Sequence, residues 1–180
     1  ARQEPAPIDP RRLPRIDLVI VSHAHFDHLD IPSLRTLAGP GTAAITARGT
    51  AELFPPGFDK VTEIGPGESA RLRGLRVTAH QPDHWGARYA LDRWRGCNAY
   101  MLESDDGRVF FAGDTADTRA FDDAGPVDLS VFGVGAYDPW EHAHSTPEQA
   151  WRMAMDMRSD RLLPVHHSTF DLGEEPRSEP

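Results

Sequence analysis

The sequence has few cysteines and no long apolar runs, the features that would indicate a disulfide-rich or a membrane protein. Cys97 is its only cysteine, which excludes a framework of internal disulfides and fits a reducing compartment, so we expect a cytoplasmic protein. Apolar runs are also short: none approaches the roughly 20 residues that cross a bilayer, and no signal-peptide pattern opens the chain. We therefore expect no integral membrane segment.

Positive charge is scarce as well. Lys and Arg number 19 against 28 Asp and Glu, giving a formal net charge of −9, so a general binder of nucleic-acid backbones is excluded. Hydrophobic residues make up 39% and charged residues 26% of the 180 residues, the balance of an ordinary globular domain. With no repeat and no dividing linker, we predict one domain over residues 1–180, with an irregular lead-in at 1–14 and a flexible tail at 174–180.

The feature that stands out is Ser22-His23-Ala24-His25-Phe26-Asp27-His28, which places four candidate metal ligands within six residues. The apolar run at 16–21 before it is short and rich in branched residues, which predicts a buried strand. Side chains alternate along a strand, so two histidines spaced by two point to the same side. Imidazole and carboxylate are ligands that zinc, iron and manganese accept. A histidine-rich surface loop without metal is the alternative.

Three further candidates follow other predicted strands. His84 comes after a strand that ends near residue 80, Asp114 follows Phe110-Phe111-Ala112-Gly113, and His166 follows Pro164-Val165. Ligands at strand ends can meet at one edge of a sheet, as a single metal site requires. A lone histidine is more often a surface or packing residue, an interpretation we keep for His80, His142 and His167. For Asp114 the alternative is an ordinary turn residue.

The rest of the chain predicts a mixed α/β order. Asp105-Asp106-Gly107 is a strong hairpin signal, and Thr146-Pro147 marks the start of the clearest helix. We expect strands at 42–46, 61–79 (three short ones), 97–104, 108–112, 127–134 and 162–165, helices at 31–37 and 146–157, helical turns at 48–54 and 118–124, and a site loop at 80–96.

Taken in order, these motifs resemble the metallo-β-lactamase-fold hydrolases. Within that superfamily the chain is most similar to the N-acyl phosphatidylethanolamine phospholipase D group, and the ascorbate phosphate lactonases are a neighbouring group. The local resemblances include His28-Leu29-Asp30, His84-Trp85, Gly135-Ala136-Tyr137, His144 before Thr146-Pro147-Glu148, and Pro164-Val165-His166-His167. Together they extend over about residues 15–172, in the family's order.

The resemblance implies a four-layer αββα sandwich and two divalent metal ions, zinc first, with manganese or iron as alternatives. It implies that His23, His25 and His84 hold one ion, that Asp27, His28 and His166 hold the second, and that Asp114 bridges both. The fold normally begins with several strands that precede the His-x-His motif. Here that place holds only fourteen irregular residues, so we expect the first N-terminal strands to be lacking, the chain to be a processed or truncated piece, and a homo-oligomer to form through the uncovered sheet.

The expected reaction is hydrolysis of a phosphodiester or related ester, phospholipase D-like, in which a metal-bridging hydroxide attacks. Asp27 would orient the hydroxide, and His144 would contact the substrate or protonate the leaving group, beside a helix N-terminus that favours an anion. Trp85 and Tyr137 are candidates for the substrate wall, and Phe26 for either wall or core. The alternatives are a lactonase acting on a phosphorylated sugar-type lactone, and a truncated, inactive metal-binding module. The expected partner is a small-molecule or lipid-like phosphodiester and not a nucleic acid.

Overall fold

The computed structural model describes residues 8–89, 91–176 and 179. Among them, no helix has the length and apolar character that a membrane span needs. The elements in chain order are η1 (Pro10–Arg12), β1 (Leu18–Val21), α1 (Ile31–Leu37), β2 (Ala43–Ala47), η2 (Ala51–Leu53), β3 (Lys60–Ile64), β4 (Ser69–Leu72), β5 (Leu75–His80), β6 (Ala99–Ser104), β7 (Gly107–Phe111), β8 (Leu129–Gly133), α2 (Pro147–Asp156) and β9 (Leu162–Val165).

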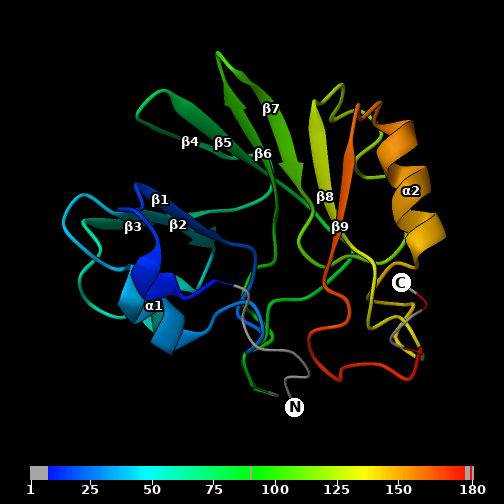
Figure 1. Cartoon of the computed structure of the whole chain (residues 1–180), viewed down its shortest axis with the longest axis horizontal. Helices are drawn as coiled ribbons and strands as arrows, with labels where there is room; N and C mark the ends of the chain where they lie inside the picture. Colours follow the sequence, from blue (N-terminus) through cyan, green and yellow to red (C-terminus); the bar gives the residue numbers. More distant parts are fainter. Residues whose placement is uncertain (1–7, 90, 177–178, 180) are drawn as a thin grey trace.

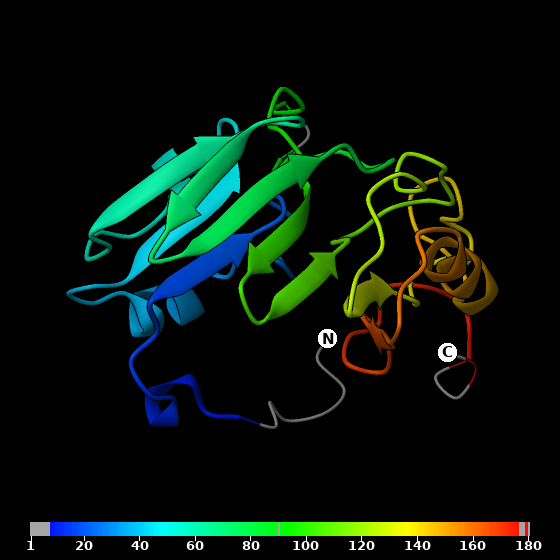
Figure 2. The same cartoon turned by 90° about the horizontal axis from the view of Figure 1, so that it is seen from above.

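The strands form two sheets. One is three-stranded and parallel, in the order β1-β2-β3, and the other is six-stranded, in the order β4-β5-β6-β7-β8-β9. Helix α1 lies beside the first sheet and α2 beside β8 and β9 of the second (Figure 1). Seen from above, α2 flanks the six-stranded sheet on the side away from the three-stranded one (Figure 2).

Alternation along the strands builds the layers, because successive side chains point to opposite faces. In β6, Ala99 and Met101 pack toward Met153 of α2. Tyr100 of the same strand points the other way, into a core that it shares with Ile45 of the three-stranded sheet. On the far face of that sheet, residues of β1 pack with Leu34 of α1 in a third cluster. The order of layers is therefore helix, sheet, sheet, helix, which confirms the predicted αββα sandwich.

Most predicted elements are present, with two differences. Residues 118–124 form hydrogen-bonded turns and no helix. The run is too short for its few helical hydrogen bonds to offset the cost of nucleation. The turns predicted at 48–54 reduce to the single 3₁₀ turn η2. Before β1, the described residues contain the 3₁₀ turn η1 and no strand. Residues 1–7 of the predicted lead-in and residues 177, 178 and 180 of the tail lie outside the described residues.

The topology brings the predicted ligand positions to one edge. Strand β6 is antiparallel to both β5 and β7, while β7, β8 and β9 run parallel to one another. The carboxyl ends of β5, β7, β8 and β9 therefore point the same way, and the loops that follow them converge where the segment after β1 also lies (Figure 1). Chemistry at this edge is the usual arrangement in α/β proteins.

Candidate metal centre

The ligand segment after β1 is held by the six-stranded sheet. The Tyr100 hydroxyl donates to the carbonyl of Val21 at 3.0 Å, and the backbone amide of Asn98 donates to the carbonyl of Ser22 at 3.0 Å. Arg88 approaches from the loop after β5 and donates to the carbonyls of Ala24 and Leu29, at 3.0 and 2.6 Å. The backbone that carries the histidines is thus fixed from two directions.

A tight turn follows the second histidine. The carbonyl of His25 accepts from the amides of His28 at 3.2 Å and Leu29 at 2.9 Å. This turn reverses the chain and carries Asp27 and His28 to a second position beside the first pair. Asp30 then caps α1 by accepting from the backbone amide of Ser33 at 2.9 Å, which anchors the end of the segment.

Asp114 reaches the same place from the end of β7 through a glycine. Gly113 has φ +62°, and a Cβ there would lie 2.9 Å from the Cβ of Ser22. A side chain is therefore excluded both by conformation and by space. Because the backbone at Gly113 can approach the ligand segment so closely, Asp114 is only 3% exposed and lies among the imidazoles.

Two groups of ligand atoms result, and within each group the atoms lie within 4.8 Å of one another. The first contains His23, His25, His84 and Asp114, and the second contains Asp27, His28, His166 and Asp114. Asp114 Oδ2 is 3.0 Å from His28 Nε2 and 3.8 Å from His23 Nε2. His166 Nε2 is 3.1 Å from Asp27 Oδ2. The carboxylate of Asp114 is therefore common to both groups of candidate ligand atoms.

The chemistry of the donors fits divalent metal ions. His84 Nδ1 lies 2.9 Å from the carbonyl of Ala143 and donates its proton there, so the lone pair of His84 Nε2 faces the cluster. His23 Nδ1 lies 2.9 Å from Ser22 Oγ, which allows the same arrangement. His28 Nε2 is fully buried and lies 3.0 Å from Asp114 Oδ2, but it is not aligned for a hydrogen bond with any group of the described residues. Outward hydrogen bonds and inward lone pairs are the usual second-shell pattern of metal-binding histidines.

The surroundings of the clustered histidines shift their pKa values in opposite directions. Burial lowers the pKa of His84 to about 4 and also holds that of His23 well below its ordinary range. Burial acts on His28 in the same direction, but its contacts with Asp114 and Asp27 outweigh this and raise its pKa to about 10. The pKa of Asp114 is correspondingly held well below its usual value, against the effect of burial. The histidines of the first group, His23, His25 and His84, are therefore neutral at pH 7, whereas the second group is built on charge pairs.

His144 lies where a substrate contact is expected. Its Nδ1 is 3.9 Å from Asp114 Oδ2, its ring stacks on that of His166 with centroids 5.5 Å apart, and its side chain is 16% exposed. The predicted role of the adjacent helix end is weaker than expected. The amides of Thr146 and Gln149 are already paired in a capping box, at 2.9 and 3.3 Å, and Pro147 has no amide proton, so fewer helix amides are left for an anion beside His144.

A cavity of about 270 Å³ opens beside the ligands. It is lined by His25, Asp27, Trp85, Asp114, Ala136, Trp140, His144, His166 and Leu172. Trp85 lines this cavity and stacks on His84 with ring centroids 4.6 Å apart. Tyr137 is not in this wall: it lines a separate hollow with Asp138, Pro139 and Glu141. Phe26 is 58% exposed and lies under Arg88, so it is not a core residue.

The sequence interpretation missed two wall residues. Trp140 and Leu172 occupy long connections without periodicity, where no pattern marks the inward side chain. The only available signal was the presence of a large apolar residue in an otherwise polar loop. The histidines assigned to ordinary roles lie outside both ligand groups: His80 packs on Phe110 at 5.6 Å, His142 is exposed, and His167 lines an adjoining cavity.

The chain is similar to known proteins over most of its length. The family model described as Beta-lactamase superfamily domain matches residues 1–167. An uncharacterized protein of Mycobacterium tuberculosis is 31% identical over 99% of this chain and 51% of its own length. The N-acyl-phosphatidylethanolamine-hydrolyzing phospholipase D 1 of Caenorhabditis elegans is 26% identical over 96% of this chain and 54% of its own. The chain spans about half the length of these two relatives.

Solved structures show the same fold at lower identity. The isothiocyanate hydrolase from Delia radicum gut bacteria superposes with a TM-score of 0.73 at 17% identity, covering 96% of this chain and 70% of that one. A metallo hydrolase from the archaeon Ignicoccus hospitalis gives 0.69 at 21% identity, covering 89% and 68%. With its αββα layers, its histidine and aspartate cluster at the sheet edge, and a family match over most of its length, this chain belongs to the beta-lactamase superfamily.

Proposed function

We propose that this protein is a hydrolase with two divalent ions, zinc first, that cleaves a phosphodiester or related ester carrying an apolar substituent. The observation that carries the proposal is the position of Asp114, whose one carboxylate belongs to both groups of ligand atoms. His23, His25 and His84 would hold one ion, Asp27, His28 and His166 the other, and Asp114 both. When bound, such a pair of ions supplies a nucleophilic water of lowered pKa and polarises the ester oxygen.

The protein's own residues would then position the reactants. Asp27 lines the cavity next to His166, so its carboxylate can accept a hydrogen bond from the attacking water and fix its direction. His144 faces the same space from the other side. Burial lowers its pKa, which keeps the ring neutral at pH 7 and leaves it as a hydrogen-bond donor to a phosphoryl oxygen.

The cavity wall favours an apolar substituent. Trp85, Trp140 and Leu172 all line it and are 43%, 47% and 44% exposed. Exposed aromatic and aliphatic side chains around a polar centre suit a substrate with one charged and one apolar part. The similarity to the nematode protein named as a phospholipase D supports a lipid-like phosphodiester as that substrate.

Metal content is the first test. Protein purified without added metal, or titrated after chelation, is expected to contain two ions per chain by elemental analysis. The variant His84→Ala should lose one, because it removes a ligand from the first group only. Absence of any transition metal together with no uptake on titration would refute the proposal.

Substrate class is the second test. Catalytic efficiencies on bis(p-nitrophenyl) phosphate and on a generic lactone are compared for the wild type, His144→Ala and the control His142→Ala, which removes an exposed imidazole from the same loop. We expect the phosphodiester to be preferred and His144→Ala to lower that rate by about 100-fold. Preference for the lactone would assign the protein as a lactonase. Two bound ions with no hydrolysis of either would indicate a binding module.

A further inference from the structure

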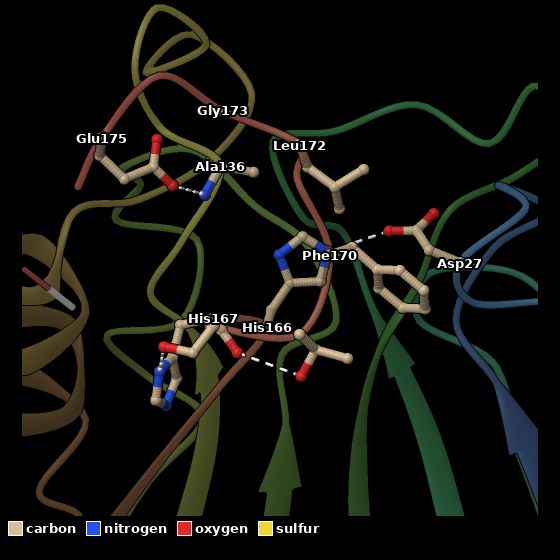
Figure 3. A pocket seen from close by; sticks show the side chains of 10 residues that line it. Asp27, Ala136, His166, His167, Phe170, Leu172, Gly173 and Glu175 are labelled. Atoms are coloured by element: carbon tan, nitrogen blue, oxygen red, sulfur yellow. Dashed lines mark hydrogen bonds and ion pairs between the residues drawn. The ribbon is translucent and has the colours of Figure 1, made fainter. Parts of the chain in front are cut away.

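The segment after β9 crosses the metal centre. This segment, residues 168–175, is called the strap below. Two residues of positive φ, His166 at 62° just before the strap and Ser168 at 57° at its start, turn the chain out of the direction of β9. Such conformations are costly for residues with a Cβ and persist where the surrounding structure holds them. Figure 3 shows the strap passing over His166 with Leu172 on the side of Asp27.

Leu172 stands where three hollows meet. One cavity, of about 210 Å³, is lined by residues of the strap together with Asp27, Ala136 and His166. The second is the cavity of about 270 Å³ beside the ligands. The third, of about 570 Å³, is lined by Phe26, Asp30 and Ser33. Asp27 and Leu172 line all three, so one leucine side chain divides the space around a metal ligand.

Glu175 attaches the strap to the connection that follows β8. Its carboxylate accepts from the backbone amide of Ala136 and, at 3.3 Å, from that of Asp138. The amide of Glu174 donates to the carbonyl of Asp138 at 2.7 Å. Figure 3 shows the Glu175 contact with Ala136 at the end of the strap away from Leu172. Because Ala136 lines two of the cavities, the same contact fixes both the strap and the facing wall.

We propose that the strap determines which substrates fit the metal centre, with Leu172 as the partition between substrate subsites and Glu175 as the positioning residue that latches it. The inference rests on the proposed function for the nature of the ligand, an anionic phosphoryl group with an apolar substituent. Compact substituents fit one cavity at a time. A bulky substituent would have to occupy more than one cavity, which requires that the Leu172 side chain be removed or displaced.

Binding of phosphonates tests the partition without turnover. Dissociation constants of methylphosphonate and naphthylphosphonate are measured on the metal-loaded protein by tryptophan fluorescence, since Trp85 and Trp140 line the cavity. Leu172→Ala should tighten the bulky ligand relative to the compact one by about tenfold, the lower end of what a hydrophobic wall discriminates. Leu163→Ala is the control, an exposed leucine of β9 that is 49% exposed against 44% for Leu172.

Hydrogen exchange of the chelated protein tests the latch independently. Glu175→Gln should speed exchange of the Ala136 and Asp138 amides by about tenfold, because hydrogen bonds to a charged acceptor are lost or weakened. Glu174→Gln should leave both unchanged, since its exposed side chain is not part of the latch. Equal exchange in the two variants overturns the latch.

The two proposals fail in different ways. Altered phosphonate selectivity in Leu172→Ala without hydrolysis of any ester refutes the proposed function and leaves the strap in place. Hydrolysis with unchanged selectivity refutes the partition. If no phosphonate binds to any variant, both are overturned.

Discussion

Replacing Asp114 by asparagine tests the centre of the site most directly. The amide has nearly the shape of the carboxylate, so packing at this buried position is kept, but the negative charge between the imidazoles is lost. Asp114 Oδ2 lies 3.0 Å from His28 Nε2 and 3.6 Å from His166 Nε2. Loss of a residue that only orients a ligand typically weakens metal binding 10- to 100-fold. A direct ligand to both positions should cost at least about 100-fold, and most of the activity.

The same substitution is also expected to change the folding stability of the chelated protein. The pKa of His28 is raised to about 10, so at pH 7 its protonation contributes about 4 kcal/mol of folding stability, at about 1.36 kcal/mol per pKa unit. A group with a raised folded-state pKa contributes fully below its ordinary pKa and loses that contribution as pH rises through the folded value. Asp114→Asn should therefore destabilise the chelated protein by up to about 4 kcal/mol at pH 7, and by much less near pH 10. Asp27 Oδ2 lies 3.4 Å from His28 Nε2 and still stabilises the protonated ring in this variant, so part of the folding stability is retained.

Urea unfolding followed by circular dichroism measures this difference in the presence of a chelator at pH 7 and pH 9.5. Competition with a chromophoric chelator measures metal affinity in parallel. Asp105→Asn is the matched control, since it changes an exposed aspartate in the hairpin turn between β6 and β7. Wild-type metal content and turnover in Asp114→Asn, or a stability difference that does not change with pH, would show that Asp114 is an ordinary turn residue and refute the reasoning.

Three further outcomes are expected. Arg88→Met should lower metal affinity about tenfold with little loss of secondary structure, because two carbonyls of the ligand segment lose their donor; equal affinity by competition titration would contradict this. Thr146→Ala should destabilise the protein by about 1 kcal/mol in urea unfolding through loss of the capping box, whereas Thr36→Ala, an exposed threonine of α1, should change it less. The Cys97 thiol, buried and with its pKa raised by that burial, should react with iodoacetamide only on unfolding, and rapid labelling of the folded protein would contradict its placement.

Much of the metal centre was readable from the sequence because its signals are local. A strand followed by His-x-His-x-Asp-His fixes both the ligand types and their side of the sheet, since alternation is a property of the backbone. The same holds for the hairpin at residues 105–107 and for the Thr146 cap, which depend on neighbours within a few positions. The gathering of His84, Asp114 and His166 was predicted from two signals, namely that each follows a strand and that the order of the motifs resembles a known family.

The walls of the site were decided by tertiary structure. Tyr137 and Trp140 lie three positions apart in one irregular connection, yet only Trp140 faces the metal cavity. That connection is held by Glu175, 39 residues from Ala136, and no local pattern records a contact of such separation. Periodicity marks burial within a regular element, whereas a loop takes its direction from distant partners. The sequence by itself therefore determined the candidate ligands and their chemical types, and the packing of the chain against itself determined the shape of the cavity beside them.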